Sequence, residues 1–211
     1  MVNINNRINL KKSSGFTLIE LVIVVVILGF LAVTAIPKFL DLTEQAKQAN
    51  IEGMAGGFAT GVSLARAQWE AEGRPQVNNL NSVNYDGSTL ILTTENAANN
   101  IRPGYVTGLT DGAVLGTGFN AANCAEIWNN ILQQPPRITN SLTVLNNDNS
   151  MKYFVSETGT SAASTCHFYL KESLNRDSSG DYLNPGTSIT IGNSFTYQPA
   201  NSAVTVYIKS N

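Results

Sequence analysis

Histidine and cysteine are scarce in this chain of 211 residues, which contains one histidine and two cysteines. The histidine, His167, lies between apolar residues of an expected strand, where a packed side chain is more common than a catalytic base. No nucleophile and base can be paired in the sequence, and Cys124 and Cys166 have no further ligands with which to form a metal site. These absences argue against an enzyme, a cofactor and a bound metal.

Charged residues are also few, at 13% of the chain. Arg7, Lys11 and Lys12 are the only charged residues before Phe16, so the rest of the chain has ten basic residues against 15 acidic ones. A chain without a basic surface has no electrostatic means of holding a polyanion, and we expect no nucleic-acid partner. The hydrophobic content of 43% indicates one folded domain with an appendage.

The stretch from Phe16 to Ile36 has no charge except Glu20. About 21 helical residues, at about 1.5 Å each, span about 30 Å, the thickness of bilayer hydrocarbon. The apolar pattern continues past the small residues where a signal peptidase would cut, so we expect the segment to be retained. Basic residues before it and few after it predict a cytoplasmic leader and a body on the other side of the membrane.

Beyond Pro37, apolar residues recur at steps of three and four, the spacing of an amphipathic helix. Gly73 and Pro75 are stop signals, so a helix from near Phe16 to Glu72 is predicted. Three glycines lie four residues apart on one face of this helix and require a packing reason. Close approach by a sheet is the favoured explanation and a contact between subunits the alternative. These glycines are Gly53, Gly57 and Gly61.

The remaining residues predict an α+β fold, in which the long helix packs on an antiparallel sheet. Residues 73–120 read as loops with short strands, including TLILTT at 89–94 after the turn signal Asp86-Gly87. AANCAEIWNNILQQ predicts a second helix that ends before Pro135-Pro136. Four further strands are predicted at MKYFVS, TCHFYLK, TSITIG and AVTVYIK.

The segment GFTLIELVIVVVILGFLAVTAIPKF, behind a short basic leader, resembles the class III signal of type IV pilins and covers about the first quarter of the chain. The resemblance implies a pilin fold in four parts. They are a leader (1–15), a membrane and filament-core half of the helix (16–37), an amphipathic half (38–73) and a globular head (74–211). It also implies that a prepilin peptidase cuts between Gly15 and Phe16 and methylates the new amino group of Phe16.

The same resemblance explains Glu20, a carboxylate that is costly within a membrane. The new ammonium of Phe16 in a neighbouring subunit is the expected counter-charge, so Glu20 is expected to act in assembly. A carboxylate merely tolerated near the membrane surface is the alternative. Gly29 and Pro37 weaken helical continuity, and in family filaments this stretch melts and gives extensibility. A simple kink at Pro37 is the other interpretation.

ILGFLAVTAIPKFLDL and CAEIWNNILQQPP are similar to the mannose-sensitive haemagglutinin (MSHA) group of type IVa major pilins. This resemblance implies a structural subunit that polymerises with itself into a surface filament for attachment. Its implied partners are the prepilin peptidase, the assembly machinery and lipid of the inner membrane, and a surface or glycan receptor. We expect an inner-membrane protein with a periplasmic body before assembly, and an extracellular pilus afterwards.

The only two cysteines, Cys124 and Cys166, are expected to be bridged in an exported body. In many pilins the second cysteine lies near the carboxyl terminus, whereas about 45 residues follow Cys166 here. Asp177 and Asp181 suggest calcium binding, but a solvated turn is favoured because their spacing does not fit an EF-hand. Two alternatives to a pilin remain, a type II secretion pseudopilin and a monomeric membrane-anchored binding protein.

Overall fold

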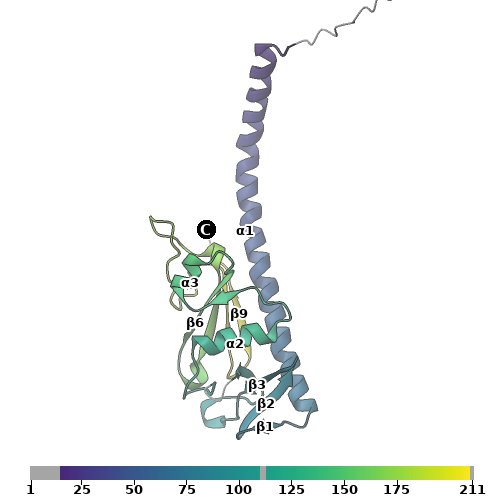
Figure 1. Ribbon diagram of the computed structural model, residues 1–211, viewed down its shortest axis with the longest axis vertical. Coiled ribbons are helices and arrows are strands. Elements are labelled where there is room, and N and C mark those ends of the chain that lie inside the picture. Colours follow the sequence, from purple (N-terminus) through teal and green to yellow (C-terminus); the bar gives the residue numbers. More distant parts are fainter. Residues whose placement is uncertain (1–14, 110–112, 210–211) are drawn as a thin grey trace, which may run out of the picture. The chain divides into compact units, whose positions relative to one another are not determined.

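The computed structural model describes residues 15–109 and 113–209. The chain divides into two units, Met1–Glu44 and Gln45–Asn211. One helix, α1 (Leu18–Ala71), has residues in both units (Figure 1). The leader predicted before Gly15 lies outside the described residues.

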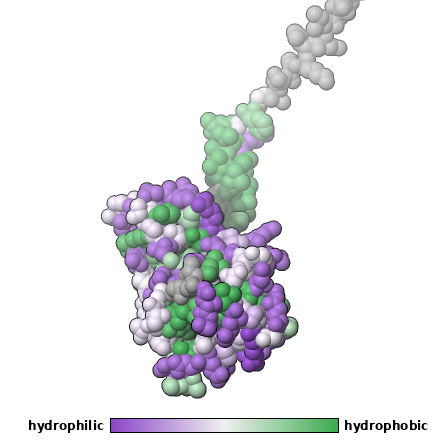
Figure 2. Space-filling view, turned by 60° about the horizontal axis from the view of Figure 1, so that its bottom comes forward, coloured by the Kyte–Doolittle hydropathy of each residue, from purple (hydrophilic) through white to green (hydrophobic). Residues whose placement is uncertain are grey.

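In the first unit, α1 is apolar and exposed on every side. The large apolar side chains between Leu18 and Leu42 are 48% to 81% exposed. In the described part of the chain, α1 is the one helix that is long and apolar enough to cross a membrane. Figure 2 shows this segment with hydrophobic residues over its surface. The predicted apolar half of the helix is therefore present.

In the second unit, α1 buries one stripe of side chains in the core of the head. The buried residues recur at steps of three and four and include Ile51, Phe58 and Trp69. The helix ends at Ala71, and Gly73 follows with a φ of 82°, a left-handed conformation that glycine adopts without strain. The predicted stop signal is thus confirmed.

The first sheet has four antiparallel strands in chain order. The connection between β2 and β3 is a two-residue hairpin at Asp86-Gly87, with φ of 48° and 84°. Left-handed backbone at both positions matches the twist of the flanking strands, and confirms the predicted turn. The strands are β1 (Gln76–Val77), β2 (Leu80–Tyr85), β3 (Ser88–Leu92) and β4 (Val106–Gly108).

The second sheet has five strands in the order β5-β6-β7-β8-β9. All neighbours are antiparallel except β5 and β6, which are parallel. The predicted antiparallel sheet is therefore present, with one parallel edge pair. The strands are β5 (Ile138–Thr139), β6 (Tyr153–Thr158), β7 (Thr165–Leu170), β8 (Ser194–Gln198) and β9 (Ala203–Tyr207).

Two short α-helices and three 3-10 turns complete the second unit. The predicted second helix is α2 (Ala121–Ile131), which contacts both β4 and β6 (Figure 1). The helix α3 (Leu142–Asn147) was not predicted from the sequence. The 3-10 turns are η1 (Ala97–Asn99), η2 (Ser161–Ala163) and η3 (Lys171–Ser173).

Aromatic side chains from α1, α2 and the second sheet form the centre of the core. The ring of Phe58 lies 5.2 Å from those of Phe168 and Tyr197, and Trp128 lies 5.3 Å from Phe168. These separations suit tilted and offset aromatic pairs. The hydroxyl of Tyr197 donates to the carbonyl oxygen of Val106 at 3.0 Å, which links the second sheet to the first.

Two expectations about this core are wrong. TSITIG is not a strand, because Ser188 accepts a hydrogen bond from the N–H of Thr190 in a turn, and β8 begins only after Gly192, whose φ is 70°. The glycine face of α1 is approached by the end of α2 and not by a sheet. A Cβ on Gly61 would collide with Cγ2 of Ile131 and would lie 2.8 Å from its carbonyl oxygen.

Candidate functional site

The start of α1 is fixed by two reciprocal hydrogen bonds between Thr17 and Glu20. The N–H of Thr17 donates to Oε2 of Glu20 at 2.8 Å, and the N–H of Glu20 donates to Oγ1 of Thr17 at 3.3 Å. The Thr17 hydroxyl donates to the same Oε2 at 2.8 Å. This is a capping box, which satisfies helix N–H groups that have no partner within the helix. The carboxylate is therefore held at the positive end of the helix dipole.

Thr17, which caps this helix, was not predicted from the sequence. Its signal was present, because threonine followed three residues later by glutamate is the pattern of a capping box. The counter-charge expected for Glu20 belongs to another subunit, whereas its hydrogen-bond donors in the structure lie one helical turn away in the same chain. Within residues 15–109 and 113–209, no basic side chain pairs with Glu20.

The predicted cleavage junction, Gly15-Phe16, lies immediately before the helix. The side chain of Phe16 is 93% exposed. No atom lies within 4 Å of the position that a Cβ on Gly15 would take. The peptide bond between these residues is thus open to another protein, and the side chain of Glu20 lies one helical turn away.

Gly29 and Pro37 both lie inside α1, which is helical through both positions. Gly29 has no atom within 4 Å of a hypothetical Cβ. It lines a shallow apolar hollow together with Val26, Phe30 and Val33. The expected loosening of the helix in a filament remains a prediction.

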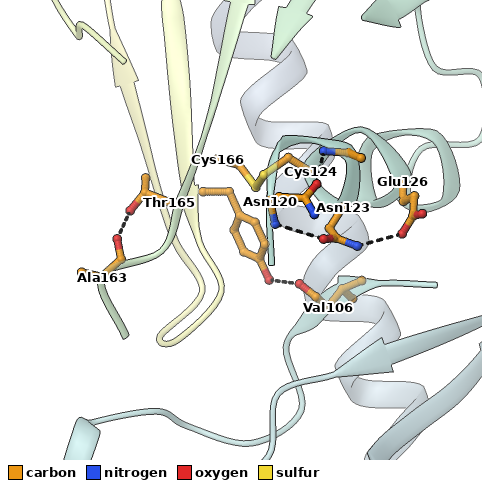
Figure 3. Close-up of a disulfide and its surroundings, with 10 residues drawn as sticks. Val106, Asn120, Asn123, Cys124, Glu126, Ala163, Thr165 and Cys166 are labelled. Atoms are coloured by element: carbon orange, nitrogen blue, oxygen red, sulfur yellow. Dashed lines mark hydrogen bonds between the residues drawn. A yellow bond between two sulfur atoms is a disulfide. The ribbon is translucent and has the colours of Figure 1, made fainter. Parts of the chain in front are cut away.

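Cys124 and Cys166 form a disulfide that joins α2 to β7 (Figure 3). Their Cα atoms are 5.6 Å apart, and both residues are fully buried in the aromatic core. Asn120 caps α2 through its side chain, which accepts from the N–H of Ala122 at 2.8 Å. The predicted pairing of the two cysteines is confirmed.

Glu126 connects α2 to the first sheet near this disulfide. Its Oε2 accepts from Nδ2 of Asn123 at 3.3 Å (Figure 3). The same oxygen accepts from the N–H of Leu109 at 3.0 Å. Leu109 follows β4 directly, so this carboxylate positions the end of that strand. The disulfide and Glu126 together fix α2 between the two sheets.

His167 and the aspartate pair have structural surroundings. His167 is 5% exposed on β7, and burial lowers the pKa of its imidazole. Oδ1 of Asp177 accepts from the N–H groups of Ser179 and Asp181 at 2.8 and 3.0 Å, an arrangement that closes a turn. In the part of the chain that the structure describes, no three metal-binding side chains form a group.

The geometry defines a class of protein with a long N-terminal helix and an α+β head. The helix is apolar and exposed in its first half, and it begins with a capping box that contains Glu20 and directly follows Gly15-Phe16. Residues 10–36 match the prokaryotic N-terminal methylation motif. The chain is 42% identical over 78 residues to the type IV narrow pilus major component PilA5 of Thermus thermophilus, which covers 37% of this chain and 66% of PilA5. These matches support a type IV pilin.

A second relative is the fimbrial protein of Moraxella nonliquefaciens. It is 42% identical over 52 residues, which are 25% of this chain and 34% of that protein. The match thus spans less than two thirds of the length of either relative. No solved structure matches the chain significantly. Assignment to the MSHA group stays a prediction.

Proposed function

We propose that this chain is the structural subunit of a type IV pilus, assembled through its N-terminal helix. The observation that carries the proposal is the methylation motif at residues 10–36, which coincides with the capped start and exposed apolar part of α1. Exposed apolar surface of this extent needs lipid or protein to cover it. Lipid covers it before assembly, and the helices of neighbouring subunits cover it in the filament.

Processing begins at the Gly15-Phe16 junction. The prepilin peptidase cuts this bond on the cytoplasmic side and methylates the new amino group of Phe16. The capping box survives the cut, because its backbone donor is the amide of Thr17 and not the amine of Phe16. Glu20 therefore stays oriented at the start of the helix while the new positive charge appears beside it.

Glu20 then receives the ammonium of Phe16 from a neighbouring subunit. Both ions lose water when the helices pack, and pairing offsets this loss. Because Thr17 restricts the Glu20 side chain before the neighbour arrives, less conformational entropy is lost on pairing. In this scheme Glu20 sets the register of one subunit against the next.

The filament serves attachment, as in the MSHA group that the sequence resembles, and its head presents a surface to a receptor or glycan. The inner-membrane assembly machinery is the other expected partner. The role is structural and not catalytic. A type II secretion pseudopilin is less well supported, because such proteins usually lack a disulfide, and a monomeric anchored binding protein would not need the methylation motif.

Mass spectrometry of sheared surface fibres tests this proposal. The expected subunit begins with N-methylated Phe16 and contains the Cys124–Cys166 bridge. A Gly15→Val variant should stay unprocessed in the membrane and form no fibres, although the structure has room for its side chain. Fibres built from subunits that still carry residues 1–15 would contradict the processing step, and a membrane-held chain that never forms fibres would favour the monomeric alternative.

A further inference from the structure

A segment between η3 and β8 crosses the second sheet on the face away from α1. We call residues 183–192 the strap. The strap begins directly after Tyr182, whose N–H donates to Oδ1 of Asn146 at 2.7 Å. The strap ends directly before Asn193, whose N–H donates to Oγ of Ser173 at 2.7 Å. The strap is therefore fixed at both ends.

Two side chains of the sheet bind the middle of the strap. The hydroxyl of Ser156 on β6 donates to the carbonyl oxygen of Gly186 at 2.5 Å. The hydroxyl of Tyr169 on β7 donates to the carbonyl oxygen of Ser188 at 3.0 Å. Pro185 and Ile191 also pack against the sheet side, whereas Leu183 and Ile189 are 47% and 44% exposed. The two hydroxyl bonds therefore add to a small apolar contact in holding the middle of the strap.

The only histidine of the chain lies beside both of these side chains. His167 pairs directly with Ser156 across the sheet. Its ring is parallel to that of Tyr169, with centroids 6.3 Å apart and planes 9° apart. His167 is 5% exposed, and its Nε2 is buried without a hydrogen-bond partner. A buried polar atom of this kind is uncommon and needs a reason.

Among the residues that the structure describes, no counter-charge faces His167. The strap, β8 and β9 contain no charged residue, and burial raises the pKa of Tyr169 to about 12, so its phenol is neutral. Glu157 on β6 lies opposite Cys166, on the other face of the sheet. The cations at the first end of the strap, Lys171 and Arg176, lie over the Tyr182 ring at 5.1 and 3.9 Å.

The other charged groups near the ends of these elements do not balance a charge on His167. Asp177 uses its carboxylate to close its own turn, and Nζ of Lys209 donates to Oδ1 of Asn175 at 3.0 Å. The remaining charged groups are Asp148, Lys152, Glu172 and Asp181. Burial alone, with no contribution from a neighbouring charge, lowers the pKa of His167. A protonated His167 would therefore be an unpaired charge in a buried site, which is strongly unfavourable.

We propose that the strap is a latch released by acid, closed over neutral His167 and opened when His167 takes up a proton. Opening breaks the bonds from Ser156 and Tyr169, admits water to the imidazolium and exposes the hydroxyls of this sheet face. The core on the other face, with its disulfide, does not take part. Acid thus changes the surface of the head without unfolding it.

The sign follows from the burial of the imidazole, which lowers the pKa of His167 in the closed state from its usual value of 6.5. The open state then binds a proton more readily than the closed state. Closure keeps its full advantage above about pH 6.5 and loses it progressively as the pH falls toward the closed-state pKa. As the pH falls from 6.5 to the closed-state pKa, the equilibrium constant for opening the strap rises by up to about tenfold for each pH unit.

Hydrogen exchange in the full chain, held in detergent micelles, tests the latch. Protection factors of the strap amides, corrected for intrinsic exchange at each pH, should fall between pH 7.5 and pH 5, while β6 and β7 keep theirs. His167→Gln should keep a protected strap at both values. Ser156→Ala should weaken strap protection at both values by one common factor, because it removes a bond that does not titrate.

A second measurement does not depend on any variant folding. Since His167 is the only histidine, its imidazole gives a single NMR titration in the wild-type chain. Its midpoint should lie below 6.5 and coincide with the loss of strap protection. A midpoint at or above 6.5 would overturn the latch, and so would strap protection that does not change with pH or that falls equally in His167→Gln.

Discussion

At the scale of single residues, we propose two separate tasks for Glu20. In the isolated chain its carboxylate completes the capping box with Thr17. In the proposed filament it also balances a neighbour's ammonium. The first task needs only a hydrogen-bond acceptor, and the second needs a negative charge. The two tasks can therefore be separated by substitution.

Glu20→Gln keeps an acceptor for Thr17 but removes the charge, because glutamine also completes a capping box. We expect the subunit to stay in the membrane in normal amount, while surface filament falls by about tenfold or more, since the neighbour's amine is then buried without a partner. The measurement compares sheared filament with membrane-held subunit in the same cells.

Two further variants are compared with Glu20→Gln. Glu20→Leu removes both the acceptor and the charge, and Glu20→Asp keeps the charge but shortens the side chain. Filament yields should fall in both Gln and Leu variants. Normal filaments from Glu20→Gln would show that charge is not required. Loss of the subunit from the membrane would assign Glu20 to insertion or folding instead.

At the scale of elements, the glycines of α1 serve different purposes. Gly61 lies against the end of α2, where no Cβ fits. Gly53, on the same face two turns earlier, has no atom within 4 Å of a hypothetical Cβ. Glycines at the same regular spacing therefore differ in their surroundings, because Gly61 is in tight contact and Gly53 is open.

Gly61→Ala should lower the free energy of unfolding of the head by about 1 to 3 kcal/mol, because backbone and side chain of Ile131 must move. Gly53→Ala should raise it by up to about 1 kcal/mol through helix propensity. Urea unfolding followed by tryptophan fluorescence measures both, since Trp69 and Trp128 are buried. Equal effects of the two substitutions would contradict this assignment.

The elements that could be predicted are those with a local signal. The Asp86-Gly87 hairpin and α2, with its apolar spacing and terminal prolines, depend on neighbouring residues alone. The strand prediction at TSITIG was wrong because alternation of threonine and isoleucine occurs within a hydrogen-bonded turn. The contact of Gly61 with Ile131 joins distant segments and has no sequence signal.

The same distinction holds for the sites. The pairing of Cys124 with Cys166 was predictable because no other cysteine exists. The role of Thr17 was readable from a four-residue pattern. The position of His167 beneath the strap could not be predicted from the sequence. It depends on contacts of β6 and β7 with residues 186–188, which are distant in the chain.

At the scale of the whole molecule, the disulfide closes a covalent loop that contains α2, α3, β5 and β6. Replacing both cysteines by serine should lower the free energy of unfolding of the head by about 4 kcal/mol in the chain-entropy estimate for a loop of this length. Urea unfolding of the oxidised chain, the reduced chain and the double variant measures this. An oxidised chain no more stable than the double variant would contradict it.

The position of Cys166 near the start of β7 also decides how the head responds to a protease. A cut between Cys124 and Cys166, for example near the exposed Gly159, leaves both fragments joined by sulfur. A cut in the strap instead leaves β8 and β9 attached only by hydrogen bonds and packing. Nicked subunits of the first kind would migrate as intact chains until reduced, and those of the second kind would separate as soon as they were denatured.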